Sequence, residues 1–356
     1  MEAIKELIEP ISRRFIYHFM VAPRTATIQK PEWYLRQNLK WIHRELDNIK
    51  GAETRSLFIL GMLELAHKRL SRDVKTFLDL LDQQQQQQFV ERLLIHTYNE
   101  VVDYTKVIKQ LLGDQYKDLE EKHDMMALFS HQKLFQIIID VEWDHAITNL
   151  KQITRADDKW DSVLQGDYVD YYKIPRCTDR FLLLMKAISE RVECFRQTDC
   201  QFQLIDQQCL LFNKFLDTMK QATESSTVGK NIFTDMFLLA DDTIDLSKIL
   251  KVLNGLNFLR LILQEKCFIP KELINILDKT LLERLNTTTR NYVNHRNKLI
   301  DMVITIYKQV DCDHRSFMEF IRPKLSHNIF ELIRDEASEI SQKRQTETML
   351  GGLSLG

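Results

Sequence analysis

The chain has 356 residues and a formal net charge of −2, with 44% hydrophobic and 28% charged residues. This composition is typical of a globular protein, and the balanced charge gives no reason to expect nucleic acid or an anionic membrane surface as a partner. Nine glycines and six prolines are too few for the many turns of a βαβ enzyme. We therefore expect long helical elements with few breaks.

Apolar residues recur at steps of three and four along nearly the whole chain, which is the spacing of one helix face. The first such segment follows a proline, which is tolerated at the first helical position. The pattern covers residues 31–49, 57–81, 89–112, 134–153, 181–195, 202–219, 246–259, 270–310 and 317–340. No strand-type alternation persists, so the sequence predicts an all-α protein of nine or ten helices packed as antiparallel bundles.

Polar and irregular stretches divide these segments. The glutamine run Gln83–Gln88 is compatible with a disordered loop or a solvated helical stretch, and we favour the second because glutamine is a good helix former. We expect Ala222–Lys230 to be a loop. The Asp-rich stretch near Gly166 is the least regular. The predicted domains are a first helical bundle region at 1–155, an irregular linker at 156–176, a second helical bundle region at 177–345 and a disordered tail at 346–356.

No membrane span or metal site is expected. The longest apolar runs fall far short of the roughly 20 residues that a spanning helix needs, and the first residues lack the apolar stretch of a signal peptide. The six cysteines include no Cys-x-x-Cys pair, which makes a zinc site improbable. We expect no cofactor, and any membrane contact to be indirect.

Two Asp-Asp-x-x-Asp motifs, Asp157–Asp161 and Asp241–Asp245, raise the alternative of a Mg²⁺-dependent, all-helical isoprenyl diphosphate enzyme. That chemistry needs carboxylates at positions i and i+4 on one helix face, where Mg²⁺ bridges them to a diphosphate. No arginine pair follows the first motif, and no Phe-Gln pair precedes the second. Both motifs also stand where we predict helix starts, at which Asp is favoured. We therefore favour a structural role and expect no catalytic residue.

A block near the N-terminus is more specific than any of these motifs. It consists of Tyr17, His18 and Phe19, followed by Lys30, Pro31, Glu32, Trp33, Tyr34 and Leu35. The block resembles the signature of the Rad-interacting and Tip family, whose members are subunits of the endoplasmic reticulum complex that captures COPI vesicles. Two later stretches agree with the family in kind and order: Tyr171–Arg180, which contains Pro175, and Leu253–Leu259.

The resemblance implies an elongated stack of helical bundles, a helical rod, without enzymatic activity. It implies a cytoplasmic protein, peripheral on the endoplasmic reticulum, that supports Golgi-to-ER retrograde transport by contacting other tethering-complex subunits and ER SNARE proteins. Family chains carry a coiled coil before the signature block and further bundles after it, so this sequence looks like the middle part. We expect the signature residues to be structural, with Trp33 and Leu35 packed against neighbouring helices.

Overall fold

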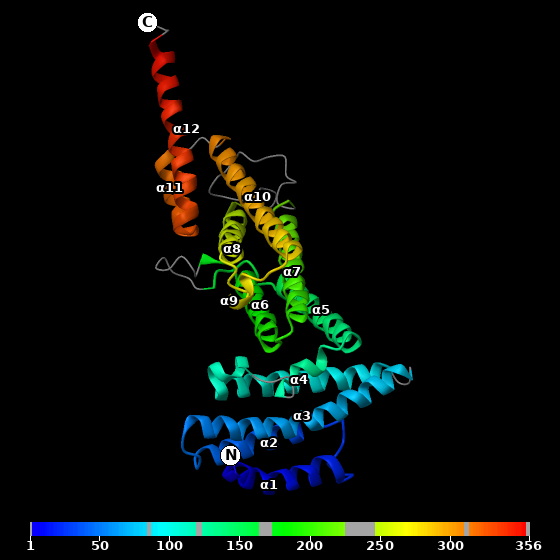
Figure 1. Ribbon diagram of the computed structural model, residues 1–356. Helices are drawn as coiled ribbons and strands as arrows, with labels where there is room; N and C mark the ends of the chain where they lie inside the picture. Colours follow the sequence, from blue (N-terminus) through cyan, green and yellow to red (C-terminus); the bar gives the residue numbers. More distant parts are fainter. Residues whose placement is uncertain are drawn as a thin grey trace. The chain divides into compact units, whose positions relative to one another are not determined.

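The computed structural model describes residues 2–83, 87–118, 123–163, 173–224, 246–309 and 313–353. Within these ranges the chain forms twelve α-helices, several short 3₁₀ or π turns, and no strand apart from an isolated bridge between Ser162 and Pro175 (Figure 1). The predicted all-α class is therefore confirmed. The chain divides into two compact units, Met1–Asp144 with Glu190–Leu204, and His145–Ser189 with Ile205–Gly356.

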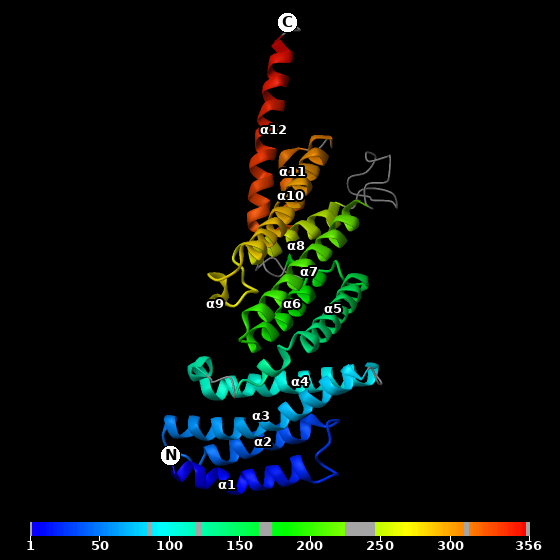
Figure 2. The same ribbon diagram turned by 45° about the vertical axis from the view of Figure 1, so that its right-hand side comes forward.

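The first unit is built on four long helices (Figure 2). They are α1 (Glu2–Ile16), α2 (Pro31–Leu46), α3 (Ala52–Asp82) and α4 (Gln87–Leu112). Helix α3 packs against α1, α2 and α4, and α2 also packs against α4. The core face of α3 carries buried side chains at steps of three and four: Phe58, Met62, Ala66, Leu70, Val74, Phe77 and Leu81. This apolar stripe is the pattern that predicted the helix.

The second unit is organised around α8 (Leu246–Gln264), which packs against α10 (Lys279–Gln309) and α12 (His327–Leu353). Helix α8 has buried residues on nearly every side, as expected of a helix inside a core rather than on its surface. The remaining long helices, α5 (Gln132–Arg155), α6 (Arg176–Cys194) and α7 (Thr198–Glu224), contain the divisions between the two units.

Two segments that the sequence predicted as single helices are each divided. The segment 270–310 forms the short α9 (Lys271–Ile274) and then α10, because the Asp278 carboxylate accepts the backbone N–H of Leu281 at 2.7 Å and starts a new helix. In the segment 317–340, Pro323 lies in a 3₁₀ turn, η7 (Arg322–Lys324), between α11 (His314–Ile321) and α12. Proline cannot donate the helical hydrogen bond, so the helix ends there.

The predicted end of the last helix is also corrected. Helix α12 continues to Leu353, so the residues from Thr346 to that point are helical rather than disordered. Glu347, Met349 and Leu350 are good helix formers and allow the extension. The predicted linker and bundle boundaries stay a prediction, since compact units defined by packing need not coincide with them. Residues 84–86 of the glutamine run and 225–230 of the expected loop lie outside the described ranges.

Candidate functional site

The two parts of the signature block meet in an aromatic cluster of the first unit. Phe19, in the π turn η1 (Tyr17–Val21), has its ring centroid 6.4 Å from that of Tyr34 in α2. Phe15 lies between them, at 5.2 Å from Phe19 and 6.3 Å from Tyr34, and also contacts Trp41 at 6.4 Å. Such tilted and edge-on pairs are the preferred aromatic geometries. The Tyr-His-Phe and Lys-Pro-Glu-Trp-Tyr-Leu stretches therefore fix the chain's path from α1 into α2.

The start of α2 is tied to α4 by ion pairs. Pro31 occupies the first turn of α2. Glu32 accepts from His96 Nε2 at 3.1 Å and lies 3.6 Å from Lys30 Nζ. Burial raises the pKa of Glu32, but hydrogen bonding at the helix start and the His96 ring outweigh this, and the net shift is downward. One turn further along α2, Arg36 forms an ion pair with Glu100 of α4 at 3.1 Å.

Exposure separates the signature residues into two groups. Pro31, Tyr34 and Leu35 are buried, as is Phe19. Trp33, by contrast, is 44% exposed, although we expected it to pack against a neighbouring helix. Trp33 lies away from the core face of α2, because it is two residues, or about 200° around the helix, from buried Leu35.

Tyr17 and His18 are also on the surface. Tyr17 is 61% exposed and its ring contacts the His18 ring at 5.1 Å between centroids. The Thr25 hydroxyl donates to the backbone carbonyl of His18, and the Ala22 N–H donates to that of Tyr17 at 2.8 Å. These bonds hold the π turn through its backbone and leave both rings at the surface.

A buried polar cluster supports the block from α3. Arg69 pairs with Asp73 at 2.8 Å, with both side chains almost fully buried, and the Arg69 guanidinium lies 5.6 Å from the centre of the Tyr34 ring. Arg69 also donates to the Thr27 carbonyl at 3.1 Å, which anchors the connection into α2. Burial raises the pKa of Asp73 to about 6, because desolvation exceeds the opposing effects of Arg69 and Tyr34.

A buried asparagine links three helices of the same unit. Asn38 of α2 donates to the Met62 carbonyl of α3 at 2.9 Å and accepts from the Tyr104 hydroxyl of α4 at 2.9 Å. All of these groups are buried, and a satisfied polar network of this kind fixes how the helices pack. These bonds join helix α2, which carries part of the signature block, to α3 and α4.

The other two family-like stretches come together in the second unit. Asn254, buried in α8, donates to the Lys324 carbonyl at 2.8 Å and to the Lys173 carbonyl at 3.3 Å. Its side-chain oxygen accepts the Ser326 N–H at 2.9 Å. One amide therefore joins the segment before α6, helix α8 and the turn between α11 and α12.

The neighbouring Gly255 permits close packing against the start of α6. A Cβ at this position would lie 2.6 Å from Thr178 Oγ1 and 3.2 Å from Pro175 Cγ, so only glycine allows the approach. Pro175 is buried, and its carbonyl accepts the Thr178 N–H at 2.9 Å, the first bond of α6. The structure gives Pro175 a packing and helix-starting position.

The first Asp-Asp-x-x-Asp motif lies in turns after α5, not at a helix start, which corrects our expectation. Its backbone carbonyls at Lys159 and Asp161 accept the first two N–H groups of α6 at 3.0 and 2.8 Å. Asp158 accepts from Arg180 at 2.7 Å and from Arg176 at 2.8 Å, and these bonds hold its pKa well below the usual value. The motif does not offer carboxylates one turn apart on a helix face, and Asp241–Asp245 lies outside the described residues.

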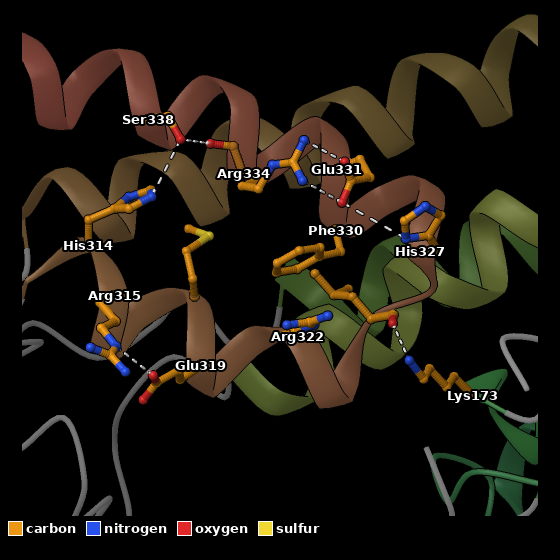
Figure 3. A pocket seen from close by; sticks show the side chains of 12 residues that line it. Lys173, His314, Arg315, Glu319, Arg322, His327, Phe330, Glu331, Arg334 and Ser338 are labelled. Carbon is orange, nitrogen blue, oxygen red and sulfur yellow. Dashed lines mark hydrogen bonds and ion pairs between the residues drawn. The ribbon is translucent and has the colours of Figure 1, made fainter. Parts of the chain in front are cut away.

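A pocket of about 490 Å³ opens between α11 and α12 in the second unit (Figure 3). Met318, Leu325 and Phe330 form its apolar part. Arg322 lies across Phe330, with its guanidinium 5.9 Å from the ring centre. Lys173 reaches in from the segment before α6 and donates to the Leu325 carbonyl at 2.7 Å. The pocket is therefore continuous with the junction that Asn254 makes.

Neither a metal cluster nor a membrane span is found in the part of the chain that the structure describes. No three His, Cys, Asp or Glu side chains there are grouped to hold a metal ion. No helix of the described ranges is long and apolar enough to cross a bilayer.

Residues 3–267 match the model of the RINT-1/TIP-1 family, which includes the signature block and both later stretches. The chain belongs to the RINT-1/TIP-1 family. The RINT1-like protein of Drosophila melanogaster is 22% identical over 276 residues, which are 74% of this chain and 33% of the relative. The chain thus spans about a third of the length of this RINT-1/TIP-1 relative. No solved structure matches it. Apart from Lys173, the residues that line the pocket between α11 and α12 lie after those that the family model matches.

Some positions could not be assigned a role from the sequence. Asn254 stands in a largely apolar stretch, where an asparagine signals a buried polar contact, but the sequence does not name its partners. Arg69 and Asp73 are an i, i+4 pair of opposite charge, which usually lies on a solvated helix face. Their burial follows from the packing of α2 and the 22–30 connection on α3, which no local pattern encodes.

Proposed function

We propose that this chain is a non-enzymatic subunit of a vesicle-tethering complex at the endoplasmic reticulum. It supports Golgi-to-ER retrograde transport by COPI vesicles through contacts with other tether subunits and with ER SNARE proteins. The observation that carries the proposal is the match to the RINT-1/TIP-1 family over residues 3–267. Tethering by such a subunit is geometric, because bundled helices hold binding sites at set positions without bond chemistry.

The surface of the signature block supports a role in protein contacts. Its buried members already satisfy the packing of α1 and α2, so exposed Trp33 and Tyr17 are not needed for the core. Exposed aromatic side chains of this kind are enriched in protein interfaces, where tryptophan and tyrosine often dominate the binding energy. We assign Trp33 to a partner contact of the first unit.

The diphosphate-enzyme alternative receives no such support from the described part of the chain. In the first motif, Asp158 is held by two arginines, and a metal ion would have to displace both. The turns at 157–161 also prevent the helical spacing that Mg²⁺ bridging requires. We therefore propose the tethering function alone.

The proposal predicts that membrane association depends on proteins. Purified chain should float with liposomes that carry reconstituted ER SNARE proteins and stay in solution with bare liposomes. Trp33→Ala should reduce flotation, whereas Phe89→Ala, which removes an aromatic ring of similar exposure (38%) from α4 of the same unit, should not. Efficient flotation on bare liposomes would contradict the proposal.

A further inference from the structure

The pocket between α11 and α12 carries more positive than negative charge. Its lining includes four cationic side chains, Lys173, Arg315, Arg322 and Arg334, but only two carboxylates, Glu319 and Glu331. His314 and His327 stand at its edges (Figure 3). A site with this balance attracts an acidic ligand.

Most of these cations already have partners. Arg315 pairs with Glu319 at 2.9 Å, and Arg334 pairs with Glu331 at 2.8 Å. Lys173 donates to the Leu325 backbone carbonyl at 2.7 Å.

Arg322 differs from the other pocket arginines. Its guanidinium lies 5.9 Å from the centre of the Phe330 ring, and no carboxylate of the described residues lies within ion-pair distance of it. A guanidinium presents a planar set of donors that matches one carboxylate. The pocket therefore combines the hydrogen-bond donors of one guanidinium with a group of apolar side chains.

We propose that this pocket binds an acidic peptide segment of a partner protein. An apolar side chain of the peptide lies on Met318 and Phe330, and a neighbouring Asp or Glu accepts hydrogen bonds from Arg322, with Lys173 adding favourable charge. Glu319 and Glu331 repel further anions, which limits the site to one closely bound carboxylate. All lining residues except Lys173 lie beyond residue 267, and the inference does not depend on the tethering function.

The same features disfavour a phosphorylated lipid headgroup. A phosphate with several negative charges is usually held by a cluster of converging cations, but Arg315 and Arg334 are engaged by carboxylates here. The apolar side chains of the pocket would have no partner in such a headgroup, whereas they suit an aromatic or aliphatic side chain.

The test uses the full chain and a short fluorescein-labelled peptide in which Asp-Phe and Glu-Leu pairs alternate. Fluorescence polarisation should show saturable binding that weakens with added salt. Arg322→Glu should weaken it by about tenfold or more, because the variant places a carboxylate against the ligand. Arg290→Glu makes the same change at an exposed position of α10 outside the pocket and should leave the affinity within about twofold.

Two altered peptides test the two halves of the site. A peptide with Asn and Gln in place of Asp and Glu, and one with Ser in place of Phe and Leu, should both bind more weakly than the probe. Circular dichroism should show that Arg322→Glu keeps its helices; should it unfold, Arg322→Gln replaces it, with a smaller loss expected. Absence of saturable binding, or equal binding to the variant, would overturn the proposal. So would Arg322-dependent flotation on phosphoinositide vesicles that the peptide does not compete.

Discussion

Replacing Asn254 by alanine tests the junction in the second unit most sharply. The amide is buried and serves two backbone carbonyls and one backbone N–H, at 2.8, 3.3 and 2.9 Å. Alanine removes all three bonds. The turn between α11 and α12 would then lose its main polar tie to α8.

The magnitude follows from the groups left without partners. A buried backbone group that loses its hydrogen bond costs about 1–3 kcal/mol. The 3.3 Å bond to the Lys173 carbonyl is long and contributes least, and the Lys324 and Ser326 groups can regain part of their bonding from solvent. We therefore expect Asn254→Ala to lower the free energy of unfolding by roughly 2–4 kcal/mol.

The assay combines urea denaturation with hydrogen exchange. Circular dichroism reports the loss of stability, and the exchange rate of the Ser326 amide reports the local bond directly. The matched control is Asn257→Ala, which removes another buried asparagine of α8. The side-chain oxygen of Asn257 accepts a long hydrogen bond of 3.3 Å from Arg260. A loss below about 1 kcal/mol for Asn254→Ala, or unchanged Ser326 exchange, would refute the reasoning.

Five further predictions concern both units and the sequence motifs. Burial raises the pKa of Asp73 to about 6, so the folded state retains a proton that the unfolded chain releases. The free energy of unfolding should therefore fall by roughly 3 kcal/mol as the pH rises from about 4 through 6. Urea denaturation at several pH values should show that Asp73→Asn weakens this dependence of stability on pH. Leu35→Ala should lower the free energy of unfolding by about 2–5 kcal/mol in thermal denaturation, because the side chain is 1% exposed. Trp33→Ala should cost less than about 1 kcal/mol and instead weaken partner binding; a large loss of stability with intact binding would restore the structural interpretation. Gly255→Val should destabilise by about 1–3 kcal/mol through overpacking, with an unchanged melting temperature as the contrary result. Calorimetry with Mg²⁺ and isoprenyl diphosphate should show no binding, and a diphosphate-dependent Mg²⁺ signal abolished by Asp241→Ala would revive the enzyme.

The helices could be predicted because helical periodicity is local. The stripe at 57–81 and the scarcity of glycine and proline both predict the long α3. The breaks before α10 and α12 were missed because apolar spacing continues across them, and only the capping contact of Asp278 and the geometry at Pro323 interrupt the backbone. Helix ends depend on such single contacts, which periodicity does not encode.

The candidate site was predictable in its residues but not in its arrangement. The signature block was found as a motif, yet the sequence does not distinguish buried Leu35 from exposed Trp33, because both are apolar and close together on α2. That distinction depends on which faces of α2 the helices α1, α3 and α4 cover. The pocket between α11 and α12 was not predicted, because its lining residues become neighbours only after the chain reverses direction in the turn that contains Pro323.

Co-purification of the tagged chain from cells, followed by quantitative mass spectrometry, tests the proposed function most directly. The account predicts enrichment of other tethering-complex subunits and ER SNARE proteins, reduced by Trp33→Ala and unchanged by Phe89→Ala. A purified chain that is stable and abundant but enriches neither class of protein would contradict it.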